Sequence, residues 1–160
     1  MSTPAANNVR RAGIDDLDSL ASLFDAYRQF YAQPPDQERA RAFLAERIAH
    51  DESVLLLAEH AGAAAGFVQL YPLFSSVRTG RIWTLNDLFV APTARRLGVA
   101  RALLQAACAH GRATGALGLQ LETTRDNRNA QALYRSEGWQ DGDTLWFHHD
   151  LTDAKPMERT

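Results

Sequence analysis

Hydrophobic residues recur along the first part of the chain with the three-to-four-residue spacing of amphipathic helices. One such segment starts at Asp15 and ends before the proline pair at 34–35, and its apolar positions are Leu17, Ala21, Phe24, Tyr27 and Tyr31. A second segment starts at about Asp36, and its apolar positions are Ala40, Phe43, Leu44 and Ile48. This spacing places the apolar side chains on one face of a helix. We therefore predict two helices, separated by the prolines.

The next part of the chain has the pattern of β-strands. Residues 53–60 and 65–74 are apolar runs, and the Ala-Gly-Ala sequence at 61–63 is typical of a tight turn between them. A third run, which contains Trp83, Leu85, Leu88, Phe89 and Val90, follows a polar loop and ends before Pro92. We expect three consecutive antiparallel strands, with a short edge strand at 9–12.

The remaining elements alternate between helix and strand. Apolar residues at helical spacing predict a helix from about Gly98 to near Gly115, and residues 117–123 alternate between leucine and polar residues as in a strand. Because a helix joins this strand to the preceding one, the two should run parallel in a right-handed crossover. A short helix at 127–137, a last pair of strands around Trp139 and at 145–151, and a polar tail at 152–160 complete the prediction.

Composition limits the class of protein. A chain of 160 residues, 46% hydrophobic and 22% charged, suits a single globular domain, with an ordered core at about 9–151. The net charge of −2 provides no general attraction to nucleic acid or to an anionic membrane. Cys108 is the only cysteine, which fits a reducing compartment. No apolar run spans a bilayer and no signal peptide is evident, so we expect a cytoplasmic protein.

The turn before the third helix has the properties of an anion site. The first turn of a helix leaves backbone N–H groups without partners and carries the positive end of the dipole. Gly98 and Ala100 are small enough to let a phosphate reach these groups, and Arg95 and Arg96 add charge. No nucleotide P-loop pattern of glycine, four residues and Gly-Lys-Ser/Thr is present. The alternative is an ordinary pair of surface arginines before a helix.

Two motifs resemble those of the GNAT acetyltransferase superfamily. The pattern Arg95-x-x-Gly98-x-Ala100 resembles its coenzyme A pyrophosphate loop. About thirty residues further on, a second pattern resembles the superfamily's N-x-x-A-x-x-L-Y-x-x-x-G-(F/W) run, at Asn127, Ala130, Leu133, Tyr134, Gly138 and Trp139. The resemblance implies a single-domain α/β fold. Its sheet would be mixed, mostly antiparallel and splayed at the central strands, with helices on both faces.

The resemblance also implies acetyl-CoA as the acyl donor and a set of residues that hold it. The pantetheine arm would bond to the backbone of the central strand at Phe89, Val90 and Ala91. The pyrophosphate would lie on the amides of Arg95, Arg96, Leu97, Gly98, Val99 and Ala100. Asn127 matches an asparagine that helps to hold the coenzyme. Arg96 and Arg101 either add charge near the phosphates or are ordinary exposed arginines.

Transfer to an amine requires a base, an oxyanion donor and an acid for the departing thiolate. Tyr134 matches the superfamily's general acid, although it also fits a role in packing its helix on the sheet. The oxyanion donor would be a backbone N–H, that of Val90. The aromatic residues of the first helix, with Arg28, are candidates for one wall of the acceptor pocket or for the core: Tyr27, Phe30 and Tyr31.

The base is less defined by the sequence. The run from Leu85 to Val90, LNDLFV, resembles the LEDLFV stretch of the diamine acetyltransferase branch, which is close to the Hpa2-like enzymes. Asn86 stands where that branch has glutamate and cannot accept a proton. Asp87 can attract a protonated amine, or act as a base through water if burial raises its pKa. Its alternative is an ion pair with Arg81, and Glu122 is a weaker candidate for the base, since strand alternation can turn it away.

We therefore predict an N-acetyltransferase for a primary amine, either a polyamine, a lysine-like amino acid or a protein lysine. The alternative is a non-catalytic acyl-CoA-binding module that senses the coenzyme. We expect no metal, because His148, His149 and Asp150 are consecutive on a predicted strand and point alternately to opposite faces. Relatives are commonly homodimers, and the apolar Trp146 and Phe147 are compatible with one.

Overall fold

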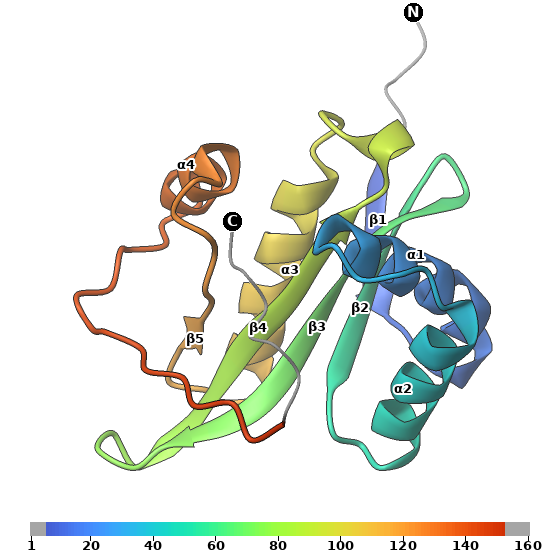
Figure 1. The fold of residues 1–160 in the computed structure, drawn as a ribbon. Helices are drawn as coiled ribbons and strands as arrows, with labels where there is room; N and C mark the ends of the chain where they lie inside the picture. Colours follow the sequence, from blue (N-terminus) through green and yellow to red (C-terminus); the bar gives the residue numbers. More distant parts are fainter. Residues whose placement is uncertain (1–5, 153–160) are drawn as a thin grey trace, which may run out of the picture.

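The computed structural model of the chain describes residues 6–152 and contains one five-stranded sheet in the order β1-β2-β3-β4-β5 (Figure 1). The first four strands are antiparallel neighbours, and β5 runs parallel to β4. The strands are β1 (Asn7–Arg11), β2 (Val54–His60), β3 (Ala63–Ser75), β4 (Gly80–Val90) and β5 (Leu119–Gln120). This arrangement confirms the predicted mixed, mostly antiparallel sheet.

Helices cover both faces of the sheet, as predicted (Figure 1). The helices are α1 (Leu17–Phe30), α2 (Gln37–Ala49), α3 (Val99–Ala113) and α4 (Arg128–Ser136), with short 3-10 turns η1 (Ile14–Asp16) and η2 (Pro92–Ala94). Asp36 caps α2 by accepting a 2.9 Å hydrogen bond from the Arg39 N–H, and Asn127 caps α4 by accepting one of 3.3 Å from the Ala130 N–H. These caps satisfy backbone donors that the first turn of a helix leaves unpaired.

Two hydrophobic cores flank the sheet. Side chains of α1 and α2 pack on one face, where the fully buried members are Leu20, Leu44, Leu55, Leu57 and Phe67. Side chains of α3 pack on the other face, with Val68, Leu70, Val99, Leu103 and Leu104 fully buried. Burial of each such side chain stabilises the fold by about 1.5–3 kcal/mol relative to exposure. The sheet therefore separates an α1–α2 side from an α3 side.

A β-bulge at Asn86 changes the face to which β4 directs its side chains. Leu70 pairs with Leu85, whereas Gln69 pairs with Asp87, so Asn86 is an inserted residue. Before the bulge, Leu85 packs in the core on the α3 side, and after it Phe89 packs in the core on the α1–α2 side. A bulge of this kind redirects side chains near functional sites. Strict alternation would have placed Leu85, Asp87 and Phe89 on one face.

The sheet is open where β4 and β5 separate. The pairing of β5 with β4 is confined to Trp83 and Thr84. From Leu85 to Val90, no strand of the described chain lies along the β5 side of β4, while the other side is paired with β3 throughout. The splay that the resemblance implied is therefore present.

The predicted strands around Trp139 and at 145–151 are wrong. The chain after α4 has no strand up to residue 152, and its apolar side chains are exposed, with Trp146 at 67% and Phe147 at 89%. The predicted strand at 117–123 is likewise shortened to β5. A strand requires a neighbour for its hydrogen bonds, and alternation in the sequence does not supply one. The predicted tail lies outside the described residues, apart from Thr152.

Candidate active site

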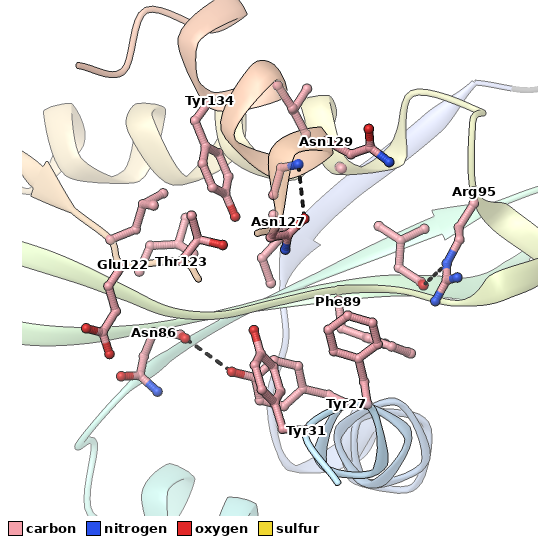
Figure 2. Close-up of a pocket in the computed structure, with 18 residues that line it drawn as sticks. Tyr27, Tyr31, Asn86, Phe89, Arg95, Glu122, Thr123, Asn127, Asn129 and Tyr134 are labelled. Carbon is pink, nitrogen blue, oxygen red and sulfur yellow. Dashed lines mark hydrogen bonds between the residues drawn. The ribbon is translucent and has the colours of Figure 1, made fainter. Parts of the chain in front are cut away.

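A cavity of about 380 Å³ lies along the unpaired edge of β4, between α1 and α4. We call it the open-edge cavity. Figure 2 shows Tyr134 entering it from α4, and Tyr27 of α1 and Tyr31, the residue after α1, from the opposite side. Of the residues predicted from sequence, this cavity is lined by Phe89, Val90, Arg95, Ala100, Asn127, Tyr134, Tyr27, Tyr31 and Asn86. The structure therefore brings together groups that lie more than a hundred residues apart.

A second cavity of about 450 Å³ lies on the other side of β4, beneath α1 and α2. We call it the α1–α2 cavity. Its walls are mainly aromatic, and Asp87, Arg28 and Arg39 are its charged residues. Tyr27, Tyr31 and Asn86 line both cavities. These three residues therefore mark the place where molecules bound in the two cavities would meet.

The loop between β4 and α3 presents backbone N–H groups at the end of the open-edge cavity. Gly98 is the residue before α3 and has a φ of 77°, a conformation that glycine adopts without strain. The Asn7 side chain holds the loop by donating a 2.8 Å hydrogen bond to the Leu97 carbonyl. Arg96 also has a positive φ, of 64°. The helix dipole and the free amides make this loop suited to an anion.

Val90 directs its backbone toward the open-edge cavity. The neighbouring Ala91 N–H donates a 2.8 Å hydrogen bond to Ala65 on β3, and successive peptide groups of a strand point to opposite sides. The N–H and carbonyl of Val90 therefore point to the unpaired edge. Arg95 donates a hydrogen bond of 3.4 Å from its Nε to this carbonyl, as Figure 2 shows. The N–H of Val90 is available to a ligand in the cavity.

Tyr134 presents its hydroxyl to the open-edge cavity (Figure 2). Burial, and to a smaller extent Tyr31, raises the pKa of Tyr134 above the ordinary tyrosine value. The phenol therefore remains protonated at neutral pH and can donate a proton. Its ring also lies 6.3 Å from that of Trp139 and packs against the α3-side core, so packing in the core and exposure of the hydroxyl to the cavity are compatible.

Asp87 is held in a buried hydrogen-bonded network that faces the α1–α2 cavity. Its side chain accepts hydrogen bonds of 2.6 Å from Gln69 and 2.9 Å from Asn86, and Gln69 in turn accepts one of 2.8 Å from Ser53. The residue is only 3% exposed. Burial raises the pKa of Asp87, and the hydrogen bonds from Gln69, Asn86 and Tyr27 partly offset this rise. Burial thus has the effect expected if Asp87 is to act as a base.

The alternative of an ion pair between Asp87 and Arg81 is wrong. The Arg81 guanidinium lies over the rings of Phe74 and Trp83, at 4.9 and 5.4 Å from their centroids. Within residues 6–152, Asp87 has no cationic partner, and its hydrogen-bond donors are neutral. An ionised Asp87 therefore has no compensating positive charge in the described chain.

Tyr27 serves both as a core residue and as a wall of the site. Its ring packs at 6.0 and 6.4 Å from those of Phe67 and Phe89, and its hydroxyl donates a 3.4 Å hydrogen bond to the Asn86 carbonyl. Tyr31 lies against it, with ring centroids 5.0 Å apart. Burial is the largest cause of a raised pKa in both tyrosines. The two interpretations of these aromatics are therefore compatible.

Several predicted residues lie beside the open-edge cavity without lining it: Ala91, Arg96, Leu97, Gly98, Val99 and Arg101. Arg101 forms an ion pair with Glu137, which places its charge against a carboxylate. Asp87 lines only the α1–α2 cavity.

Three further polar residues lie at the site: Glu122, which is only a weak candidate for the base in the sequence, and Thr123 and Asn129, which the sequence motifs do not indicate. All three line the open-edge cavity, and Glu122 lies near Asn86 at one end of it (Figure 2). Glu122 is a weaker candidate for the base in the sequence because alternation of a strand through it can turn its side chain away. Since β5 ends at Gln120, that alternation does not apply. The sequence signal that could have indicated Asn129 is its position two residues after Asn127, the asparagine of the motif.

Among residues 6–152, no three histidine, cysteine, aspartate or glutamate side chains gather closely enough to hold a metal ion. Within the same residues, no helix has the length and apolar character needed to cross a membrane.

Comparison with known proteins agrees with this geometry. The model of the Acetyltransferase (GNAT) family matches residues 19–139. The chain is 46% identical over 144 residues to the uncharacterized N-acetyltransferase YhfO of Bacillus subtilis (strain 168), covering 90% of this chain and 96% of YhfO. It is similar to the crystal structure of a probable acetyltransferase, with a TM-score of 0.86 and 40% identity over 91% of this chain and 99% of that one.

A more distant structure shares the fold. The aminoglycoside N-acetyltransferase AAC(6')-Iy in complex with CoA has a TM-score of 0.80 at 19% identity, and the match covers 95% of this chain and 99% of that one.

Proposed function

The chain belongs to the GNAT family of acetyltransferases, and we propose that it transfers an acetyl group from acetyl-CoA directly to a small primary amine. The observation that carries this proposal is the unpaired edge of β4. Val90 on this edge lines the same cavity as Ala100 at the start of α3 and Tyr134 on α4. An extended ligand that carries both a phosphate and a reactive thioester fits this set of groups.

The donor would occupy the open-edge cavity. Its pantetheine arm would bond to the free edge of β4 at Phe89 to Ala91, as an added strand does. Its pyrophosphate would lie on the backbone amides from Arg95 to Ala100, where Gly98 lets a phosphate approach closely. Asn127 lines the cavity and uses its side-chain oxygen to cap α4, so it would contribute through its amide group.

The acceptor would enter through the α1–α2 cavity and reach the thioester at Tyr27, Tyr31 and Asn86, the residues common to both cavities. The amine nitrogen forms a bond to the acetyl carbon, and the Val90 N–H stabilises the oxyanion that develops. Asp87 takes the amine proton, directly or through water. The carbon–sulfur bond then breaks, and the Tyr134 hydroxyl gives its proton to the departing thiolate.

The proposal is tested by measuring free coenzyme A release and acetylated product over a panel of amines. The panel contains spermidine, putrescine, lysine, thialysine, an aminoglycoside and a lysine-rich peptide, and acetyl-CoA binding is measured by calorimetry in parallel. We expect binding and turnover with at least one class of amine. Binding without turnover would instead support a sensing module, an interpretation favoured by the absence of a carboxylate at Asn86. Absence of binding would contradict both interpretations.

We also propose that the protein works in the cytoplasm as a homodimer. The single cysteine is consistent with a reducing compartment. The exposed Leu145, Trp146 and Phe147 form an apolar segment that has no partner strand in the described chain. Such a segment is typical of an interface. Light scattering should give the mass of a dimer, and the double substitution W146S/F147S should give a monomer. A monomeric wild-type protein would contradict this proposal.

A further inference from the structure

The charges around the α1–α2 cavity are separated in a way that restricts the acceptor. Asp87 lies at the buried end, 3% exposed, whereas Arg39 is exposed in the first turn of α2 and lines the same cavity. Aromatic side chains form most of the wall around them, among them Phe24, Phe43 and Tyr71. The cavity therefore has a negative interior end and a positive outer side, with apolar walls.

Arg39 is the cation of this cavity that has no anionic partner in the described chain. The other one, Arg28, lies 2.7 Å from Asp25, donates a hydrogen bond to the Pro34 carbonyl, and is thereby neutralised. Arg39 contributes its backbone N–H to the cap of α2, and its guanidinium forms no ion pair within residues 6–152. A guanidinium presents several donors in a planar arrangement that suits a carboxylate.

In contrast to Arg39, the carboxylate of Asp87 would be stabilised by a positively charged group. Its hydrogen-bond donors are Gln69, Asn86 and Tyr27, all of them neutral. A buried carboxylate without a cation is destabilised unless it takes up a proton or a positively charged group approaches. A ligand with an ammonium at one end and an anion at the other would compensate both Asp87 and Arg39.

We infer that the acceptor is a primary amine that also carries a carboxylate, such as an amino acid, with its ammonium group directed to Asp87 and its carboxylate bound by Arg39. This inference rests on the proposed function and narrows it. A diamine or polyamine satisfies Asp87 but places its second ammonium beside Arg39, where like charges repel. The cavity volume of about 450 Å³ lies within the range of small-molecule sites. Arg39 thus acts as a specificity-determining residue.

The test compares three series of probes that differ only in the group opposite the amine. These are ω-amino acids from 4-aminobutanoate to 6-aminohexanoate, n-alkylamines of matching length, and α,ω-diamines of matching length. We expect kcat/KM for the best amino acid to exceed that of the matched alkylamine by about tenfold to hundredfold, the range of a hydrogen bond between charged groups. The diamine should be the poorest of the three.

Variants of α2 isolate the contribution of Arg39. R39A should reduce the ratio of kcat/KM for the amino acid to that for the alkylamine to about one, mainly through the KM for the amino acid. R39E should favour the diamine. The matched control is R41A, since Arg41 lies on the same helix but pairs with Asp18, and it should leave the preference unchanged. A preference that survives R39A, or a wild-type enzyme that acts on alkylamines or diamines as well as on amino acids, would overturn the inference but leave acetyl transfer intact.

Binding measurements distinguish a failure of this inference from a failure of the proposed function. If neither these probes nor any amine of the panel is acetylated, the proposed function fails, but calorimetry with the same probes still decides the charge pattern. Binding of amino acids that is weakened by R39A and not by R41A would support the inference. Equal binding of all three series would contradict it.

Discussion

The two cavities beside β4 are built from different parts of the polypeptide. The open-edge cavity offers mainly backbone groups, the free edge of β4 and the amides at the start of α3, together with the hydroxyl of Tyr134, the proposed acid. The α1–α2 cavity offers side chains, with Asp87 held by Gln69 and Arg39 at its outer side. A site built from backbone groups keeps its hydrogen-bonding groups when side chains are substituted. In a site built from side chains, a substitution changes the groups that bind the ligand. Under the proposed function, the first cavity would hold the common donor and the second would select the acceptor.

The largest effect should come from the acid of the open-edge cavity. Substitution Y134F removes one hydroxyl and keeps the ring that packs against the core. We expect kcat to fall by about 10²–10⁴-fold, the usual contribution of a positioned acid. The KM for acetyl-CoA and the melting temperature should change little. Unchanged turnover would remove Tyr134 from the mechanism.

A smaller loss should follow substitution of the base in the α1–α2 cavity. We expect D87N to lower kcat/KM for a cationic amine by about tenfold to hundredfold, since asparagine neither attracts the ammonium nor accepts its proton. In the wild type, activity should fall as pH decreases through the raised pKa of Asp87, because protonation abolishes the base. This acid limb should be missing from the pH profile of D87N.

The same D87N variant should also change how the free energy of unfolding depends on pH. Burial raises the pKa of Asp87 in the folded chain above its unfolded value. The folded state therefore binds the proton more tightly, and the free energy of unfolding falls as pH rises between the two pKa values. D87N removes this pH-dependent term, so urea denaturation at pH 5 and pH 8 should show a smaller difference than in the wild type. An unchanged difference between the two pH values would show that Asp87 contributes no such pH-dependent term.

The backbone character of the open-edge cavity is tested at a glycine. Gly98 and Gly115 both have positive φ, of 77° and 68°, and an added Cβ would clash with nothing at either position. Each G-to-A substitution should therefore cost a similar free energy of unfolding, about 1–2 kcal/mol. Only G98A should weaken acetyl-CoA binding, by several-fold in calorimetry. Equal affinity in G98A and G115A would show that the loop does not hold the donor.

The smallest effect is expected at the boundary between the cavities. N86E adds a carboxylate next to Asp87, and a neighbouring like charge raises the pKa of an acid further. The acid limb of the pH profile should move upward by about one pH unit or less. The ratio of diamine to amino acid turnover should rise, because the site becomes more negative. A downward shift would show that the new carboxylate does not lie near Asp87.

The sequence by itself determined most of the elements and the family. Periodicity located the helices and the first strands to within a few residues, because amphipathic faces follow from local spacing. The run from Arg95 to Ala100 and the motif around Tyr134 indicated the family because each is a short contiguous pattern. The roles given to these residues stay predictions.

Tertiary structure decided the rest. The bulge at Asn86 exists only because β3 pairs with β4 in a particular register, and it is this bulge that turns Asp87 toward the α1–α2 cavity. Local alternation cannot reveal an inserted residue, nor can it show that Gln69 and Ser53 lie behind that carboxylate. The same pattern predicted strands near Trp146 that have no neighbour in the described chain. Pairing between distant segments sets the geometry of a sheet, and a sequence read locally does not contain it.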